Sequence, residues 1–136
     1  MLKLVQTDWG RFDLAFDDSA LDDPDSAVAT LVYAVLFTDA EAPSSREPDA
    51  YHRRGWWADP DAGSPLWHVR RQPLSSAARR EALDSVRTAL TLRAPALTGI
   101  DVQETSAAEP AGNISSVSLE VTGFHNGRKF IVKAPL

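Results

Sequence analysis

The chain has 136 residues, of which 43% are hydrophobic and 24% are charged, and this balance predicts one folded domain spanning residues 1–136. Cysteine is absent, which excludes disulfides, thiolate catalysis and cysteine-based zinc sites. The formal net charge is −5, so we expect no general attraction to nucleic acid or anionic lipid. The longest strongly apolar run, residues 31–37, is shorter than the roughly 20 residues that cross a membrane. No export signal opens the chain, and we expect a soluble protein.

The N-terminal part predicts a β-hairpin followed by a helix. Residues 2–6 are apolar, and residues 11–16 alternate, with Phe12, Leu14 and Phe16 on one face. Alternation with a period of two is typical of a half-buried strand. Apolar residues then recur at helical spacing, which predicts a helix from Ser26 to about Asp39, capped by Asp25 or Ser26.

The middle of the chain predicts an irregular segment. Between residues 40 and 65, repeated prolines and glycines interrupt any period. Irregular segments of this length inside a compact domain are more often functional or bound to a partner than idle. The following residues, 64–71, predict a short strand in which Leu66, His68 and Arg70 face opposite to Trp67 and Val69.

The C-terminal half predicts a helix and three strands. An apolar stripe from Ala82 to Leu90 indicates a helix capped by Ser75 or Ser76 and ended by Pro95 and Gly99. Strands are expected at 100–105, 114–122 and 128–133, and Asn126-Gly127 is a strong hairpin signal. The whole order predicts an α+β domain, in which two helices pack on a mainly antiparallel sheet and a long irregular central loop intervenes.

Patterns that would indicate catalysis or a cofactor are missing from the sequence. There is no nucleophile elbow, phosphate loop or dinucleotide motif, and we expect no catalytic residue, metal or cofactor. Asp59, Asp61 and Gly63 faintly resemble a calcium loop, but arginine stands at position 70, where that loop needs an acid. The glutamates are interpreted as solvated acids: Glu41, Glu47, Glu81, Glu104, Glu109 and Glu120.

Two adjacent tryptophans dominate the central segment. In an extended segment, Trp56 and Trp57 would point to opposite faces, so that one could enter the core while the other faces outward. An outward tryptophan beside Arg53 or Arg54 has the composition of an interface hot spot. Folding of the loop back over both rings is the alternative, and it stays open here.

Several phrases together resemble a family of Mu-type phage and prophage tail proteins known as gene product forty-six. The phrases are residues 36–39 (LFTD), 54–59 (RGWWAD) and 63–67 (GSPLW). The resemblance covers roughly residues 8 to 95 and, more distantly, extends to the lysozyme-like wedge proteins of contractile-tail baseplates. Ala40 and Glu41 stand where the family commonly has an arginine, and His68 stands where it continues apolar.

The resemblance implies a non-enzymatic structural subunit of a phage tail baseplate, assembled in the cytoplasm of the bacterial host. Its expected partners are other wedge or hub proteins and the tail sheath, with several copies in a ring. The residues expected to fix the central loop or meet a partner are Arg53, Arg54, Gly55, Trp56, Trp57, Asp59 and Trp67.

Two other interpretations belong to different classes of protein. A tail-associated peptidoglycan hydrolase would use Glu81, Glu104 or Glu120, and a carbohydrate-binding module would use the exposed tryptophans. Separately, the basic last strand is a candidate sheet edge for strand addition, with Arg128, Phe130 and Val132 as its residues.

Overall fold

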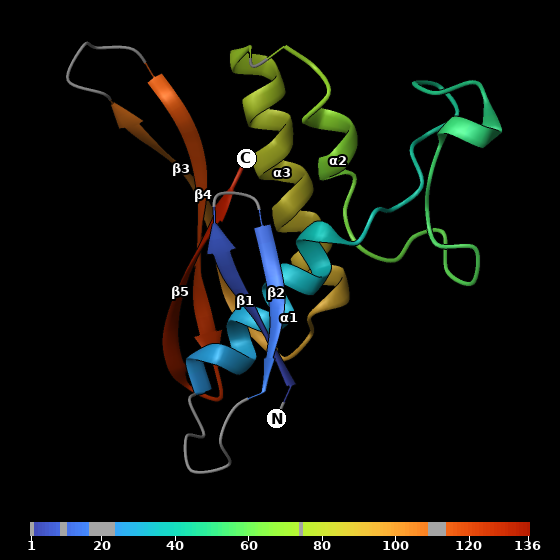
Figure 1. The fold of residues 1–136 in the computed structure, drawn as a ribbon. Helices are drawn as coiled ribbons and strands as arrows, with labels where there is room; N and C mark the ends of the chain where they lie inside the picture. Colours follow the sequence, from blue (N-terminus) through green and yellow to red (C-terminus); the bar gives the residue numbers. More distant parts are fainter. Residues whose placement is uncertain (1, 9–10, 17–23, 74, 109–113) are drawn as a thin grey trace.

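The computed structural model describes residues 2–8, 11–16, 24–73, 75–108 and 114–136. It confirms an α+β fold with antiparallel sheets and two main helices (Figure 1). A three-stranded sheet, in the order β3-β4-β5, forms one layer, and the helices α1 and α3 cover one of its faces. A separate hairpin of β1 and β2 packs against α1.

The N-terminal hairpin confirms the sequence prediction in outline. Strand β1 (Leu2–Asp8) pairs antiparallel with β2 (Arg11–Phe16). Phe12 is half-buried, and its ring centroid lies 4.9 Å from that of Tyr33 and 4.8 Å from that of Phe37 on α1. Leu14, which was expected on the same buried face, is 59% exposed. The Phe12 ring therefore joins the hairpin to α1 through aromatic contacts, and the side chain of Phe16, expected on the same face, lies outside the described residues.

Helix α1 (Pro24–Phe37) begins two residues earlier than the sequence predicted. Pro24 is its first residue, a position where the missing amide costs no hydrogen bond. The prediction that Asp25 or Ser26 caps the helix is wrong, because both lie inside the first turn. Its buried residues, spaced as one apolar face requires, are Val28, Val32, Val35 and Leu36.

The segment predicted as a short strand is a helical turn, α2 (Leu66–Val69), and that prediction is wrong. Pro65 precedes it with a φ of −79° and a ψ of 12°, which directs the chain into a helical turn. Leu66 and Val69, three positions apart, are both buried. A run this short has no clear period, so a strand and a buried helical turn look alike in the sequence.

Helix α3 (Ser76–Arg93) confirms the prediction, including its cap, because the Ser75 side chain accepts a hydrogen bond from the Ala78 amide. Its apolar stripe lies in the core, where Val86 and Leu90 are fully buried. Arg79 on the same helix forms an ion pair of 2.8 Å with Glu104 on the sheet. Burial and this ion pair together fix α3 on the sheet.

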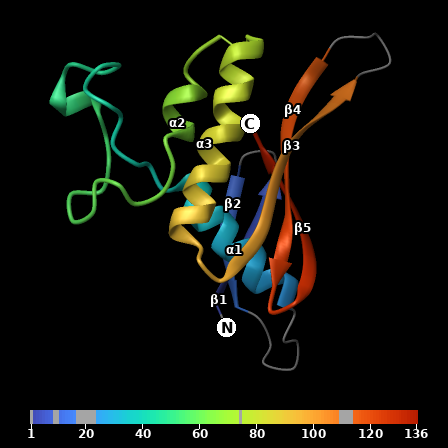
Figure 2. The ribbon, with the colours of Figure 1, turned by 180° about the vertical axis from the view of Figure 1, so that it is seen from behind.

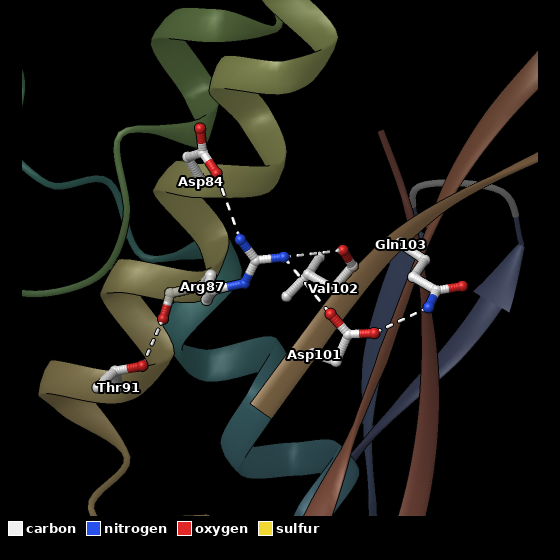
Figure 3. A network of polar contacts seen from close by, with 6 residues as sticks. All are labelled: Asp84, Arg87, Thr91, Asp101, Val102 and Gln103. Atoms are coloured by element: carbon white, nitrogen blue, oxygen red, sulfur yellow. Dashed lines mark hydrogen bonds and ion pairs between the residues drawn. The ribbon is translucent and has the colours of Figure 1, made fainter. Parts of the chain in front are cut away.

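A polar network adds a second attachment of α3 to the sheet (Figure 3). The guanidinium group of Arg87 lies 3.4 Å from a carboxylate oxygen of Asp84 and 3.4 Å from one of Asp101. It also donates to the carbonyl of Val102 at 3.4 Å. Gln103 donates to the other oxygen of Asp101 at 2.8 Å. These exposed contacts orient the helix but contribute little stability each.

The sheet consists of β3 (Leu97–Ala108), β4 (Ile114–His125) and β5 (Arg128–Pro135). Asn126 and Gly127 form the tight turn between β4 and β5 with φ values of 51° and 77°, as the hairpin signal predicted. Leu119 and Val121 on β4 are fully buried beneath the helices. Within the described residues, no helix is both long and apolar enough to cross a membrane.

Candidate functional site

Between α1 and α2 the chain leaves the body of the protein as a long irregular excursion, residues 41–63, which we call the arm (Figure 1). Its only regular element is a short 3-10 helix, η1 (Ala50–His52). The arm extends to the side of the molecule opposite β5, and the view from behind shows the same arrangement (Figure 2). The irregular central segment expected from the sequence is therefore a projection rather than a loop folded over the core.

Backbone hydrogen bonds join the two ends of the arm. The Ser64 amide donates to the Thr38 carbonyl at 2.9 Å, and the Ala40 amide donates to the Ser64 carbonyl at 3.1 Å. The Ser64 side chain is fully buried, donates to the Leu36 carbonyl at 2.8 Å and accepts from the Leu66 amide at 3.3 Å. A buried hydroxyl that has both partners is stabilising, whereas the same groups unpaired would be costly. Ser64 therefore ties the end of α1 to the start of α2.

Two glycines allow the backbone segments of the arm to lie close together. Gly63 has a φ of +91°, and a Cβ atom there would lie 2.0 Å from the Thr38 carbonyl oxygen. Gly55 has a φ of +87°, and its Cβ would lie 3.0 Å from the Cβ of Glu41. Only glycine accommodates both the conformation and the contact at Gly63.

Trp67 is the buried aromatic residue at the base of the arm. Its side chain is 8% exposed, and its indole N–H donates to the Ala40 carbonyl at 2.7 Å. The guanidinium carbon of Arg54 lies 4.7 Å from the ring centroid, and that of Arg71 lies 5.8 Å from it. Arg54 also donates to Asp39 at 2.8 Å. Trp67 of α2 thus contacts the arm through its ring and the residue just before the arm through its N–H group.

Arg53 holds the outer part of the arm together from inside. Its Nε donates to the Glu47 carbonyl at 2.8 Å, and its Nη2 donates to the Pro48 carbonyl at 2.9 Å. Its Nη1 lies 3.8 Å from a carboxylate oxygen of Glu41. A planar guanidinium group can serve several acceptors at once, so one side chain closes this loop.

Trp56 and Trp57 face outward. Trp56 is 53% exposed and Trp57 is 89% exposed, and their ring centroids lie 6.2 Å apart at an angle of 65°. They stand on a tight turn in which the Asp59 amide donates to the Trp56 carbonyl at 3.0 Å. Beside Trp56 lies an open hollow of about 510 Å³, lined by Phe37, Thr38, Asp39, Arg54, Gly55 and Trp56. Both indoles are therefore available to a partner while their backbone is fixed.

The arm brings together the central residues selected from the sequence but gives them different places. Trp67 is internal, Arg53 and Arg54 bind within the arm and its base, and only Trp56 and Trp57 are strongly exposed aromatics of that set. The sequence left two alternatives open, one ring in the core or the loop folded back over both, and the structure shows neither, because both rings face outward. Tyr51, 95% exposed on η1, was missed because no pattern in the sequence marks it.

Residues 28–122 match the family described as phage protein GP46. The chain belongs to this family. The match begins in α1, takes in the arm, α2, α3 and β3, and ends in β4, so it starts later and ends later than the resemblance expected from the sequence. The hairpin of β1 and β2 lies outside the matched range. No curated protein matches the chain.

Strand β5 of this GP46-family chain lies at one edge of its sheet. The Leu136 amide donates to the Val117 carbonyl on β4, and antiparallel bonding alternates along a strand. The backbone groups of Phe130 and Val132 therefore face β4, and those of Lys129 and Ile131 point away from the sheet. The Tyr33 hydroxyl already donates to the Lys133 carbonyl at 3.0 Å. The residues with open backbone groups differ from the ones chosen in the sequence.

The glutamates considered for hydrolysis do not share a cleft. Glu81 forms an ion pair with Arg46, Glu104 pairs with Arg79, and Glu120 lies 3.6 Å from Lys133. Glu81 is on α3, Glu104 is on β3, and Glu120 is on β4. Glu109 lies outside the described residues. Across the described part of the chain, no group of three or more histidine and carboxylate side chains is arranged to hold a metal ion.

Proposed function

We propose that this chain is a structural subunit of the baseplate of a contractile phage or prophage tail and acts by protein–protein contact. Membership in a phage protein family supports a role in a phage particle or its assembly. The observation that carries the proposal is the pair Trp56 and Trp57, held outward on an arm that is fixed at its base.

Exposed indole rings are unfavourable in water. Tryptophan buries about 150–250 Å² when covered, and removing that apolar surface from water is worth several kcal/mol. Folding within the chain leaves most of the Trp57 surface in water. The arm backbone is already ordered by Ser64, Gly63 and Arg53, so a partner that covers the indoles does not have to order the arm. These features are typical of an interface hot spot.

The arrangement of two surfaces fits an assembly of several copies. The arm and the open edge of β5 lie on opposite sides of the molecule (Figures 1 and 2). A subunit that offers two different surfaces forms heterologous contacts, which generate rings when the rotation closes. We propose that neighbouring wedge or hub proteins and the tail sheath occupy these surfaces. Lys129 and Ile131 are the residues to which an added strand would pair.

The proposed role involves no enzymatic reaction. Glycoside hydrolysis needs two carboxyl groups at a fixed separation across one cleft. Glu81, Glu104 and Glu120 each have a basic partner and lie on different elements. This arrangement favours a structural role over a peptidoglycan hydrolase. Release of soluble fragments from purified cell walls, lost on changing one of these glutamates to glutamine, would reverse that preference.

The test of the proposed function is incorporation of Trp57→Ala into tail particles. The chain is expressed in cells that produce the tails, and its amount per particle is measured after purification. We expect the variant to melt like the wild type, because Trp57 is 89% exposed, and to be at least about tenfold depleted from particles. Leu14→Ala, which removes a side chain that is 59% exposed on the hairpin, is the control and should be incorporated normally.

Two results would contradict the proposal. The first is a wild-type chain that is absent from purified tails, which removes the baseplate role. The second is normal incorporation of Trp57→Ala, which would show that Trp57 of the arm does not make the contact. Titration with soluble glycans while tryptophan fluorescence is followed separates a carbohydrate-binding module, which would show saturable quenching lost in the same variant.

A further inference from the structure

A groove of about 900 Å³ runs between the arm and the outward face of α3, and the proposed function makes no use of it. Ser85, Thr88, Ala89 and Leu92 of α3 form its floor, and Pro65 lies at the base of the arm. Leu92 is 71% exposed. The spacing of these positions places them along one face of a helix. We call this surface the arm groove.

Two ion pairs between the arm and α3 mark the length of the arm groove. Arg46 of the arm pairs with Glu81, and Asp59 of the arm lies 3.2 Å from Arg93. Glu81 and Arg93 are separated along α3 by about 18 Å, at 1.5 Å of rise per residue. The arm groove therefore offers a track as long as a helix of about 12 residues.

Each end of the arm groove has one charge without an ion pair, a basic one at the Glu81 end and an acidic one at the Arg93 end. Arg80, next to Glu81, is exposed and forms no ion pair with any residue that the structure describes. Asp61 is exposed too, and its carboxylate has no partner within the same described ranges. The Asp61 amide donates to the Asp59 carboxylate at 3.2 Å, which places Asp61 at the Arg93 end. The other charged residues at the two ends are already paired.

We propose that the arm groove binds an amphipathic helix of a partner protein, with an apolar stripe over Leu92, an acidic residue facing Arg80 and a basic residue facing Asp61. The occupant is a helix rather than a strand, because the floor is helical and offers no unpaired backbone ladder. A helix satisfies its own backbone groups and needs only side-chain contacts. The two unpaired charges then fix its direction.

The source of the helix rests on the proposed function, since we assign it to a neighbouring tail subunit. The preference of the arm groove for a helix with these charges does not rest on the proposed function, because the preference follows from Arg80, Asp61 and Leu92. Two experiments keep these statements apart. One measures the preference with synthetic peptides, and the other measures whether the groove is covered in tails.

The first experiment uses three fluorescent helical peptides of about 12 residues that share one apolar stripe. The acid–base peptide has an acidic residue at one end and a basic residue at the other. The dibasic peptide has a basic residue at both ends, and the diacidic peptide has an acidic residue at both ends. The wild-type groove should bind the acid–base peptide at least tenfold more tightly than the others, by fluorescence anisotropy. In the Arg80→Glu variant both ends of the arm groove are acidic, so this variant should prefer the dibasic peptide. Asp61→Lys leaves two basic ends and should prefer the diacidic peptide.

Matched controls alter exposed charges outside the arm groove. Arg70→Glu and Asp13→Lys make the same charge changes and should keep the wild-type preference. Leu92→Ser should weaken the binding of all three peptides without changing the order of their affinities, because it removes the shared apolar contact. Thermal melting verifies that each variant is folded. Equal affinity of the wild type for the three peptides, or a preference that Arg80→Glu and Asp61→Lys leave unchanged, overturns the proposed site.

The second experiment uses the absence of cysteine from the chain. Thr88→Cys places one thiol on the exposed floor of the arm groove, and its reaction with a maleimide is timed in the free chain and in purified tails. Slower reaction in tails, by tenfold or more, supports a neighbouring tail subunit as the source of the helix. The same rate in both overturns that assignment, whatever the peptides show.

Discussion

The guanidinium group of Arg54 lies over the ring of Trp67, 4.7 Å from its centroid, and also donates to Asp39 at 2.8 Å. Arg54 belongs to the arm, Trp67 to α2, and Asp39 follows α1. One side chain therefore connects the three segments that meet at the base of the arm. It does so from a backbone φ of 57°, which is uncommon for a residue other than glycine.

Replacement of Arg54 by alanine should lower the free energy of unfolding by about 1–2 kcal/mol. An exposed cation–π contact contributes about 0.5–1 kcal/mol, and an exposed ion pair contributes up to about 1 kcal/mol. Urea denaturation measures the change. Arg54→Gly should be less destabilising than Arg54→Ala, because glycine adopts a positive φ without strain. If alanine proves the milder change, the strained backbone is not part of the explanation.

Gly63→Ala should destabilise the protein by at least about 3 kcal/mol. The added Cβ would lie 2.0 Å from the Thr38 carbonyl oxygen at a φ of +91°, so the contact that closes the arm would have to open. Chemical denaturation measures the loss. Gly127→Ala is the control, since it has a φ of +77° with no atom within 4 Å and should cost only about 1 kcal/mol. Equal losses of stability in the two variants would mean that the close approach to Thr38 does not contribute to the effect of Gly63→Ala.

Two tryptophans of the same region should respond in opposite ways to truncation. Trp67→Ala should cost about 3–5 kcal/mol, since it leaves a cavity and frees the Ala40 carbonyl, to which the indole donates at 2.7 Å. Trp57→Ala should leave the melting temperature within about 2 °C, because surface substitutions rarely exceed about ±0.5 kcal/mol. Thermal unfolding monitored by circular dichroism compares them. A large loss in Trp57→Ala would show that the ring is covered in solution.

Tyr33 should make stability fall at alkaline pH. Burial raises the pKa of the Tyr33 hydroxyl above its ordinary value of 10.0. The folded state then holds the proton more tightly than the unfolded state, so this contribution is complete below pH 10 and is lost as pH rises through the folded pKa. Unfolding free energies measured from pH 8 to 11 should therefore decline less in Tyr33→Phe than in the wild type.

The Tyr33→Phe variant should also lose about 1 kcal/mol at neutral pH, because its hydroxyl donates to the Lys133 carbonyl at 3.0 Å. Tyr51→Phe is the control, since that ring is 95% exposed and should keep both the wild-type stability and its pH dependence. An identical alkaline profile for Tyr33→Phe and wild type would mean that Tyr33 ionises as freely in the folded state as in the unfolded state.

Long periodic segments were the predictable part of the fold. The stripe around Val86 and Leu90 indicated α3, and Asn126-Gly127 indicated the last hairpin. The turn at Leu66 to Val69 was predicted wrongly as a strand, because a run of this length has no decisive period. The fold of the arm was not predictable, since its order comes from single contacts such as those of Ser64 and Arg53 rather than from a repeated pattern.

The amino-acid composition of the central segment located the candidate site, but it did not predict which of the side chains there are exposed. Adjacent tryptophans, arginines and a glycine marked residues 53–57, yet the sequence left open whether one ring enters the core or the loop folds back over both. In the structure both are exposed, because they stand on a tight turn of the arm instead of in an extended segment over the core. The arm groove had no signal, since its two walls come from distant parts of the chain.

The sequence by itself determined the fold class, the helix of residues 76–93, the C-terminal strands and the segment that carries the aromatic residues. These follow from local periodicity and turn chemistry, which neighbouring residues encode directly. Only the tertiary structure decided which of Trp56, Trp57 and Trp67 is buried, which backbone groups of β5 are open, and which charges remain unpaired. Each of these depends on contacts between residues far apart in the chain, such as Trp67 with Ala40 and Tyr33 with Lys133.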